Sequence, residues 1–127
     1  MVRILLVDDQ PALRSMLKLR LELEPDLQVV GEAADGLAAL RAARATAPDV
    51  VVIDAEIPRM DGFAATEALQ VIAPHVRVVI LTIHDSAPWR DRAREAGASA
   101  FVPKQADDAY LLSAIRRAGR RWHSASA

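Results

Sequence analysis

The stretch VRILLVDDQPALRSMLKLRLEL, residues 2–23, joins a short apolar run to a segment with helical spacing. Its first six residues are almost all aliphatic and read as a buried strand. In its second part Leu13, Leu17 and Leu21 recur four residues apart, and Pro11 suits a first helical turn. A strand that leads directly into a helix is the repeating unit of α/β proteins.

The same alternation continues along the chain. Further strand-like runs lie near 27–31, 50–53, 76–81 and 100–102, and stretches with helical spacing follow at 36–46, 62–72, 87–96 and 108–118. Because the strands are apolar without interruption, both faces of the sheet are expected to be buried, as in a parallel sheet covered by helices. The sequence therefore predicts an α/β fold, a single doubly wound five-stranded parallel sheet flanked by five helices. Right-handed crossovers limit the strand order without fixing it.

The chain has 127 residues, enough for one domain that buries most of its apolar surface. We expect that domain to span residues 1–118. Residues 119–127 lose the apolar period and are expected to form a polar C-terminal tail or the start of a linker.

Composition excludes several classes of function. A net charge of −1 gives no overall field for nucleic acid or an anionic membrane, and the absence of cysteine excludes disulfides and thiolate metal sites. The N-terminus lacks the layout of a signal peptide, and no apolar stretch reaches the ~18 residues of a membrane helix. We expect a soluble, cytoplasmic domain without a membrane partner.

Polar residues stand where each predicted strand should stop. Asp8 and Asp9 follow the first strand, Asp54 the third, Thr82 the fourth and Lys104 the fifth. If these strands are neighbours, the five side chains meet at the carboxyl edge of the sheet, where open parallel sheets bind ligands. Carboxylates suit a hard cation such as Mg²⁺, and a hydroxyl and an ammonium suit a phosphoryl group.

Each residue also has a purely structural interpretation. Asp8 or Asp9 could cap the helix that begins at Pro11, and Asp54 could start a turn before Pro58. Thr82 could be an ordinary β-branched strand residue, Lys104 a surface lysine and Phe101 a core aromatic, so the joint order of the residues is what favours a site.

That order resembles the receiver domain of bacterial two-component response regulators. The resemblance covers essentially the whole chain and is closest to receivers of NarL/LuxR-type transcription regulators. It includes the segments Val7-Asp8-Asp9-Gln10-Pro11, Gly31-Glu32-Ala33-Ala34-Asp35-Gly36, Pro48-Asp49-Val50-Val51, Pro58-Arg59-Met60-Asp61-Gly62, Leu81-Thr82-Ile83-His84-Asp85 and Ala96-Gly97-Ala98.

The resemblance implies a flavodoxin-like receiver fold and a role for each strand-end residue. Asp54 would accept a phosphoryl group from a sensor histidine kinase. Mg²⁺ would be held by Asp8, Asp9, Asp54 and the backbone carbonyl of Glu56. Thr82 and Lys104 would contact the phosphoryl oxygens, and Thr82 and Phe101 would form the switch.

The resemblance also implies how the domain signals. Phosphorylation would change a protein-interaction face over residues 86–118, with a homodimer formed on phosphorylation, and would regulate transcription through an output domain absent from this chain. The domain would promote its own phosphorylation and dephosphorylation without being a turnover enzyme, and would not itself bind DNA. The alternative is a phosphorylation-independent receiver that acts as a protein–protein interaction module.

Three positions depart from the family pattern. Glu56 places an extra carboxylate two residues after Asp54, and its exchange for Arg or Asn is expected to change the lifetime of the phosphorylated state. Pro103 precedes Lys104, whereas many receivers have a proline after the lysine. Ile83 follows Thr82 where many relatives carry a smaller residue, and it is expected to narrow access to Thr82.

Other side chains and other classes are less well supported. His75, His84 and His123 lack the spacing of metal ligands, and His84 is expected to be an exposed loop residue. Trp89 fits either helix packing or partner contact. The basic end, Arg116, Arg117, Arg120 and Arg121, reads as solvated charge.

Two other classes of protein fit the sequence less well. A phosphatase with an Asp nucleophile would need an acid where Gln10 stands. A nucleotide- or flavin-binding module would need glycines after the first strand.

Overall fold

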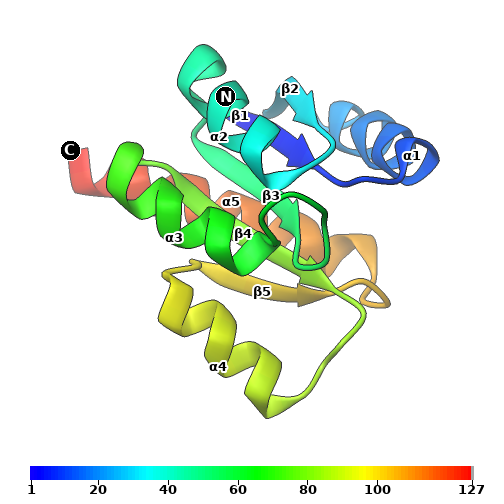
Figure 1. Cartoon of the computed structure of the whole chain (residues 1–127). Helices are drawn as coiled ribbons and strands as arrows, with labels where there is room; N and C mark the ends of the chain where they lie inside the picture. The colour runs from blue at the N-terminus through cyan, green and yellow to red at the C-terminus, as the bar shows by residue number, and fades with distance from the viewer. Residues whose placement is uncertain (127) are drawn as a thin grey trace.

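Five strands and five helices alternate along the chain, as the hydrophobic pattern predicts (Figure 1). This computed structural model describes the backbone of residues 1–126 and the side chains of residues 1–120. The elements are β1 (Val2–Val7), α1 (Pro11–Glu22), β2 (Leu27–Ala33), α2 (Gly36–Thr46), β3 (Val50–Asp54), α3 (Gly62–Ile72), β4 (Arg77–Thr82), α4 (Ala87–Ala96), β5 (Ala100–Pro103) and α5 (Asp108–Ser126).

The strands form one parallel sheet in the order β2-β1-β3-β4-β5. This is the flavodoxin-like order of doubly wound folds, in which the winding direction reverses between β1 and β3. The predicted fold class is therefore confirmed. The strand order could not be predicted from the hydrophobic pattern, because several strands are apolar enough to occupy a central place.

Two layers of helices cover the sheet. Helices α2, α3 and α4 pack on one face with Leu5, Val51 and Ile80 of the strands, and α1 and α5 pack on the other with Ile4 and Val52. Successive strand residues thus point into opposite cores, which is why β1, β3 and β4 are apolar over most of their length. Each fully buried Val or Ile contributes on the order of 2 kcal/mol, so the two cores hold the strand ends in register.

Local signals set most helix boundaries. Asp35, Asp61 and Asp107 accept backbone N–H bonds from the residue three positions later. Gly62 begins α3 directly beneath the end of β3, where an added Cβ would lie 2.4 Å from the Asp54 carbonyl oxygen. Any larger residue would push the loop after Asp54 away from the sheet.

Helix α5 extends further than the hydrophobic pattern indicates. The helical spacing was expected to end at 118, whereas the helix continues to Ser126. Apart from Trp122 the residues after 118 are polar or small, so they lack the apolar stripe that marks the other helices. The side chains of Arg121 and His123 lie outside those described, and the division of the chain at residue 118 stays a prediction.

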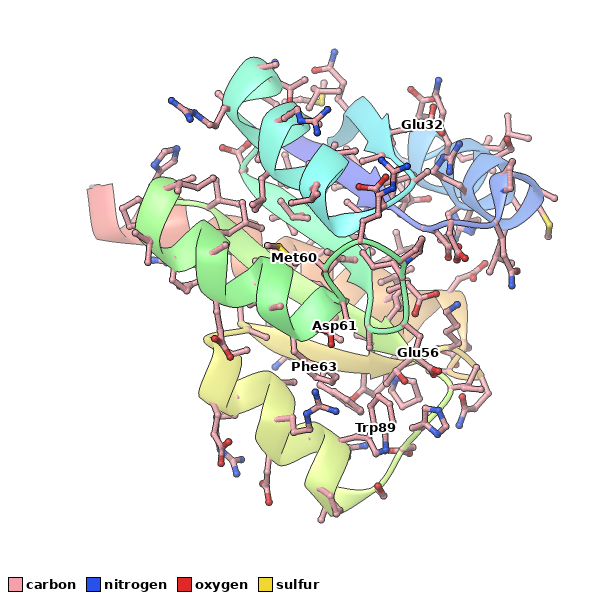
Figure 2. All side chains as sticks on the ribbon, in the orientation of Figure 1. Glu32, Glu56, Met60, Asp61, Phe63 and Trp89 are labelled. Carbon is pink, nitrogen blue, oxygen red and sulfur yellow. The ribbon has the colours of Figure 1, made fainter. Side chains whose placement is uncertain are left out.

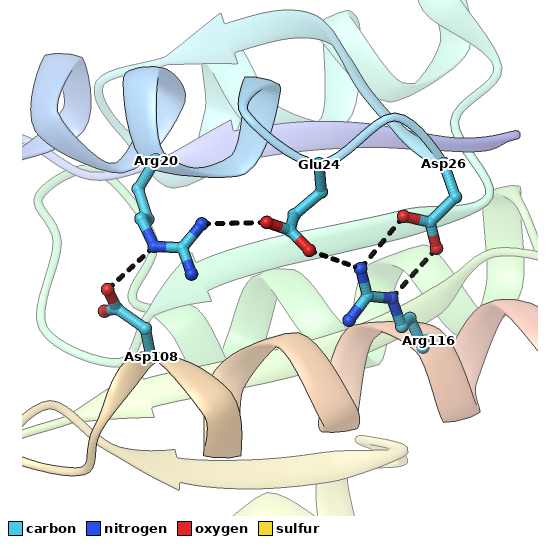
Figure 3. Close-up of polar contacts among 5 residues, drawn as sticks. All are labelled: Arg20, Glu24, Asp26, Asp108 and Arg116. Carbon is cyan, nitrogen blue, oxygen red and sulfur yellow. Dashed lines mark hydrogen bonds and ion pairs between the residues drawn. The ribbon is translucent and has the colours of Figure 1, made fainter.

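One basic residue of α5, Arg116, has structural partners and is not the solvated charge expected for the basic end. Arg116 binds Asp26 with two hydrogen bonds of 2.9 Å and Glu24 with one of 2.7 Å (Figure 3). Glu24 and Asp108 also bind Arg20 of α1, so the network joins α5 to α1 and to the loop before β2. The hydrogen bond from Arg116, followed by that from Arg20, lowers the pKa of Glu24.

Candidate functional site

All five parallel strands end at one edge of the sheet, and four of those ends supply a polar residue. Val7 lies opposite Ile53, Asp54 opposite Leu81, and Thr82 opposite Pro103. Asp8, Asp54, Thr82 and Lys104 therefore stand side by side across β1, β3, β4 and β5. The predicted meeting of these residues at the carboxyl edge is confirmed.

Asp54 is the centre of this arrangement and is 6% exposed. Its Oδ2 accepts a hydrogen bond of 2.7 Å from the Lys104 ammonium, and its Oδ1 accepts one of 3.0 Å from the Glu56 amide. The second bond is the turn expected of an Asp at this position. The turn and the site are thus compatible, because they use different oxygens of one carboxylate.

Asp8 is also buried, and only one of its carboxylate oxygens has a hydrogen-bond partner. Its Oδ1 accepts from the Gln10 amide at 2.9 Å, whereas its Oδ2 is buried without a hydrogen bond and lies 3.7 Å from the Lys104 nitrogen. The capping alternative for Asp8 and Asp9 is wrong, since the N-cap of α1 is Gln10 without a side-chain cap bond. A buried oxygen left without a donor indicates space for a ligand.

Asp8, Asp9 and Asp54 each offer a carboxylate oxygen to a common point, with these atoms within 4.8 Å of one another. Asp9 is exposed, and it lines an open cavity of about 270 Å³ together with Asp54, Lys104, Gln10, Glu56 and Ile83. The cavity therefore opens from solvent onto Asp54.

Burial and neighbouring charges shift the pKa values of Asp8 and Lys104. Burial, more than the neighbouring carboxylates Asp54 and Asp9, raises the pKa of Asp8, although the Gln10 amide and Lys104 oppose it. Burial alone would lower the pKa of Lys104, but its hydrogen bond to Asp54 and the charges of Asp54 and Asp8 outweigh that effect and raise it. The carboxylates outnumber the single ammonium, so the site favours an added cation.

Replacing Asp8 by Asn is expected to stabilise the metal-free fold at neutral pH. The pKa of Asp8 is higher in the folded than in the unfolded protein. As the pH rises through the folded pKa, ionisation of Asp8 therefore lowers the free energy of unfolding, whereas below the ordinary pKa of Asp it has no such effect. Asn removes this cost, so the unfolding midpoint of the variant should lie above that of the parent. Thermal unfolding in EDTA at neutral and at acidic pH measures this difference, which should vanish at acidic pH. An equal difference at both pH values would contradict the assignment.

Thr82 and Phe101 lie where the strand pattern places them. Thr82 is fully buried at the end of β4, and its hydroxyl accepts a hydrogen bond of 3.1 Å from the His84 amide. Phe101 is half-buried on β5 against the core that carries α4, with the Arg90 guanidinium 5.1 Å from its ring centre. The core interpretation of Phe101 is supported, and the switching roles of both residues stay predictions.

Glu56 and His84 form a pair beside the cavity. Their Oε1 and Nε2 atoms are 2.8 Å apart, and the His84 ring stacks on Trp89 with 4.1 Å between ring centres. Figure 2 shows Glu56 and Trp89 on the same side of the molecule, below the end of the sheet. His84 is therefore more than an exposed loop residue. Trp89 also packs near Phe63, which supports its packing interpretation and leaves partner contact untested.

Arg14 lies next to the site and was not among the residues predicted from the sequence. The Arg14 guanidinium donates a hydrogen bond of 2.6 Å to the Asp8 carbonyl and one of 2.9 Å to Glu32. The position of Arg14 in the first turn after the Asp pair was the available signal. Its partner could not be predicted, because Glu32 lies on β2, a separate element.

Comparison with known proteins agrees with this geometry. The family model described as the response regulator receiver domain matches residues 4–116. The response regulator GacA of Pseudomonas viridiflava is 37% identical over 126 residues, and UvrY of Escherichia coli O157:H7 is 35% identical over 116 residues. These alignments cover 98% and 91% of this chain but 59% and 53% of the relatives. The chain thus spans only about half of their length.

Solved structures show the same likeness. A LuxR-family response regulator from Aurantimonas sp. SI85-9A1 superimposes with a TM-score of 0.91 at 38% identity, covering 94% of this chain and 86% of that chain. The response regulator domain of Thermotoga maritima CheB gives a TM-score of 0.86 at 31% identity, with 94% and 97% covered. Among the described residues, no helix is long and apolar enough to cross a membrane.

Proposed function

The chain belongs to the response regulator receiver domain family, and on that premise we propose that Asp54 is its phosphoacceptor. A sensor histidine kinase donates the phosphoryl group in a Mg²⁺-dependent reaction, and the phosphorylated domain presents an altered protein-interaction face. The observation that carries this proposal is the 2.7 Å contact between Lys104 and Asp54 beside the carboxylates of Asp8 and Asp9.

The residues present fit a magnesium ion. Three carboxylate oxygens converge within 4.8 Å, and one oxygen of Asp8 is buried without a hydrogen bond. Hard cations of this size bind through a few carboxylates, with waters and substrate phosphate completing the shell. Asp8, Asp9, Asp54 and the backbone carbonyl of Glu56 would hold the ion. When bound, it would offset negative charge on the transferring phosphoryl oxygens.

The side chains of Asp54, Lys104 and Thr82 carry out the transfer. A carboxylate oxygen of Asp54 attacks phosphorus, the bond from phosphorus to the donor breaks, and an acyl phosphate forms. Lys104 then contacts a phosphoryl oxygen as a point charge. The Thr82 hydroxyl, whose oxygen accepts from the His84 amide, donates a hydrogen bond to another phosphoryl oxygen.

We propose that the signal passes from Thr82 to Phe101 and to the face formed by α4, β5 and α5. Phosphorylation adds charge and acceptor oxygens at one point, and a loop that moves toward them can repack a bistable face. The domain acts in the cytoplasm, forms a homodimer on phosphorylation, and regulates transcription through an output domain rather than by binding DNA itself. It promotes its own phosphorylation and dephosphorylation and is not a turnover enzyme.

Incubation with acetyl phosphate, read by intact mass, tests the proposal. We expect a phosphoryl adduct in the presence of Mg²⁺ and none in EDTA. Bound Mg²⁺ without an adduct would favour the alternative, a phosphorylation-independent receiver that acts by protein contact. An adduct of equal yield in EDTA would contradict the proposed metal dependence.

Exchange of Glu56 for Arg is expected to lengthen the lifetime of the phosphorylated state about fivefold. The guanidinium would place a positive charge where Glu56 now lines the cavity, and a charge contact of about 1 kcal/mol would retain the phosphoryl group. Glu56→Asn, which only removes the negative charge, should have a smaller effect in the same direction.

The lifetime is measured as the decay of the adduct by intact mass after the donor is removed. Asp85→Asn is the matched control, because Asp85 is an exposed carboxylate of the neighbouring loop that binds Arg90. Equal dephosphorylation rates in the two Glu56 variants and the parent would refute a role for Glu56.

A further inference from the structure

Arg14 connects the turn that carries Asp8 and Asp9 to a neighbouring strand. It lies in the first turns of α1, and its side chain is 19% exposed. One guanidinium nitrogen donates to the Asp8 carbonyl at 2.6 Å, and Nε donates to Glu32 Oε1 at 2.9 Å. Figure 2 shows Glu32 at the end of β2, on the side toward α1.

The backbone of Asp8 is thereby held at both ends. Its N–H donates to the Ala33 carbonyl of β2 at 3.1 Å, and its own carbonyl accepts from Arg14. That carbonyl belongs to the planar peptide unit that joins Asp8 to Asp9, so fixing its direction fixes the relative orientation of the two residues. Arg14 touches neither carboxylate, and both therefore stay available to a ligand.

We propose that Arg14 and Glu32 are positioning residues for the metal site. Arg14 orients the Asp8–Asp9 peptide so that both carboxylates face one ion, and Glu32 holds the guanidinium in that geometry. The inference rests on the proposed function, because it assumes that these carboxylates bind Mg²⁺. Partners of this kind commonly change metal affinity by 10- to 100-fold when removed, although they touch no metal.

A purely electrostatic role predicts the opposite result. The positive charge of Arg14 beside three carboxylates opposes cation binding, so its removal alone would strengthen binding. The negative charge of Glu32 offsets that effect. Removing both residues leaves the net charge as it is in the parent, so a change in affinity in the double variant reports positioning alone.

The decisive measurement is the Mg²⁺ dissociation constant of Arg14→Met/Glu32→Gln, by calorimetry without a phosphodonor. We expect binding about tenfold weaker than in the parent. Lys18→Met is the matched control, because Lys18 lies on the same helix and approaches Glu32 at 3.7 Å. It should bind Mg²⁺ like the parent. Parent-like affinity in the double variant, or an equal loss in Lys18→Met, would overturn the inference.

A second readout separates positioning from general damage. At saturating Mg²⁺ the double variant should be phosphorylated by acetyl phosphate at close to the parent rate, because Asp54 and Lys104 are intact. A lower rate that excess Mg²⁺ does not restore would overturn the positioning role. If the double variant does not fold, Arg14→Lys replaces it, with intermediate affinity expected and parent affinity contradicting the inference.

The two proposals fail in distinguishable ways. If the parent binds Mg²⁺ and forms the adduct while the double variant binds Mg²⁺ equally well, only the role of Arg14 and Glu32 is refuted. If the parent itself binds no Mg²⁺, the proposed metal site and this inference are both refuted.

Discussion

The Asp54→Asn protein is expected to form no phosphoryl adduct with acetyl phosphate and Mg²⁺, whereas the parent forms one. Asn has the shape of Asp, but an amide nitrogen replaces one carboxylate oxygen and the side chain carries no charge. It therefore cannot attack phosphorus, and no acyl phosphate forms. The side chain can still accept the Glu56 amide bond, which preserves the turn after β3. The loss should therefore be complete without loss of the fold, as measured by intact mass and thermal unfolding.

Asp49→Asn provides the matched control. Asp49 precedes β3 at the opposite edge of the sheet, where its carboxylate accepts the Arg3 amide. This variant should form the adduct at the parent rate. A normal adduct in Asp54→Asn, or its loss in Asp49→Asn, would contradict the assignment of Asp54 as the acceptor.

The Lys104→Met protein is expected to be phosphorylated roughly 100-fold more slowly than the parent. Removing one preorganised donor from the charge that develops in a transition state typically costs this much in rate. Without the ammonium, the buried carboxylates of Asp54 and Asp8 also lose their cationic partner, so the metal-free fold should become less stable. Mg²⁺ should then raise the unfolding midpoint more in the variant than in the parent.

The chain contains only one other lysine, and it serves as the control. Lys18 is half-exposed on α1 and should be replaceable by Met without change in phosphorylation rate. The prediction would be contradicted if Lys104→Met and the parent had the same phosphorylation rate and the same rise in unfolding midpoint with Mg²⁺. The 2.7 Å contact between Lys104 and Asp54 would then have no part in the transfer.

The features that could be predicted from the sequence are those set by residues close together along the chain. Alternation of apolar runs and helical spacing is a local property, and the predicted helices 36–46, 62–72 and 87–96 coincide with α2, α3 and α4. Placing polar residues at strand ends required only that parallel strands share an edge. The meeting of Asp8, Asp54 and Lys104 could therefore be predicted, although the strand order was not.

What could not be predicted depends on side chains from separate elements. The contacts of Arg14 with Glu32, and of Glu56 with His84, join residues whose spacing along the chain carries no period. The direction of the Asp8 carboxylate was also open, since both a capping bond and a ligand site suit an Asp before a helix. Only the folded geometry shows that one oxygen of Asp8 is buried without a hydrogen bond.

The most direct test of the central claim is the position of the phosphoryl group in the parent protein. After incubation with acetyl phosphate and Mg²⁺, the protein is digested at acidic pH and the modified peptide is sequenced by mass spectrometry. We predict a single modified residue, Asp54, and no modification when EDTA replaces Mg²⁺. A phosphoryl group on any other residue, or none on Asp54 while the protein binds Mg²⁺, would contradict the account.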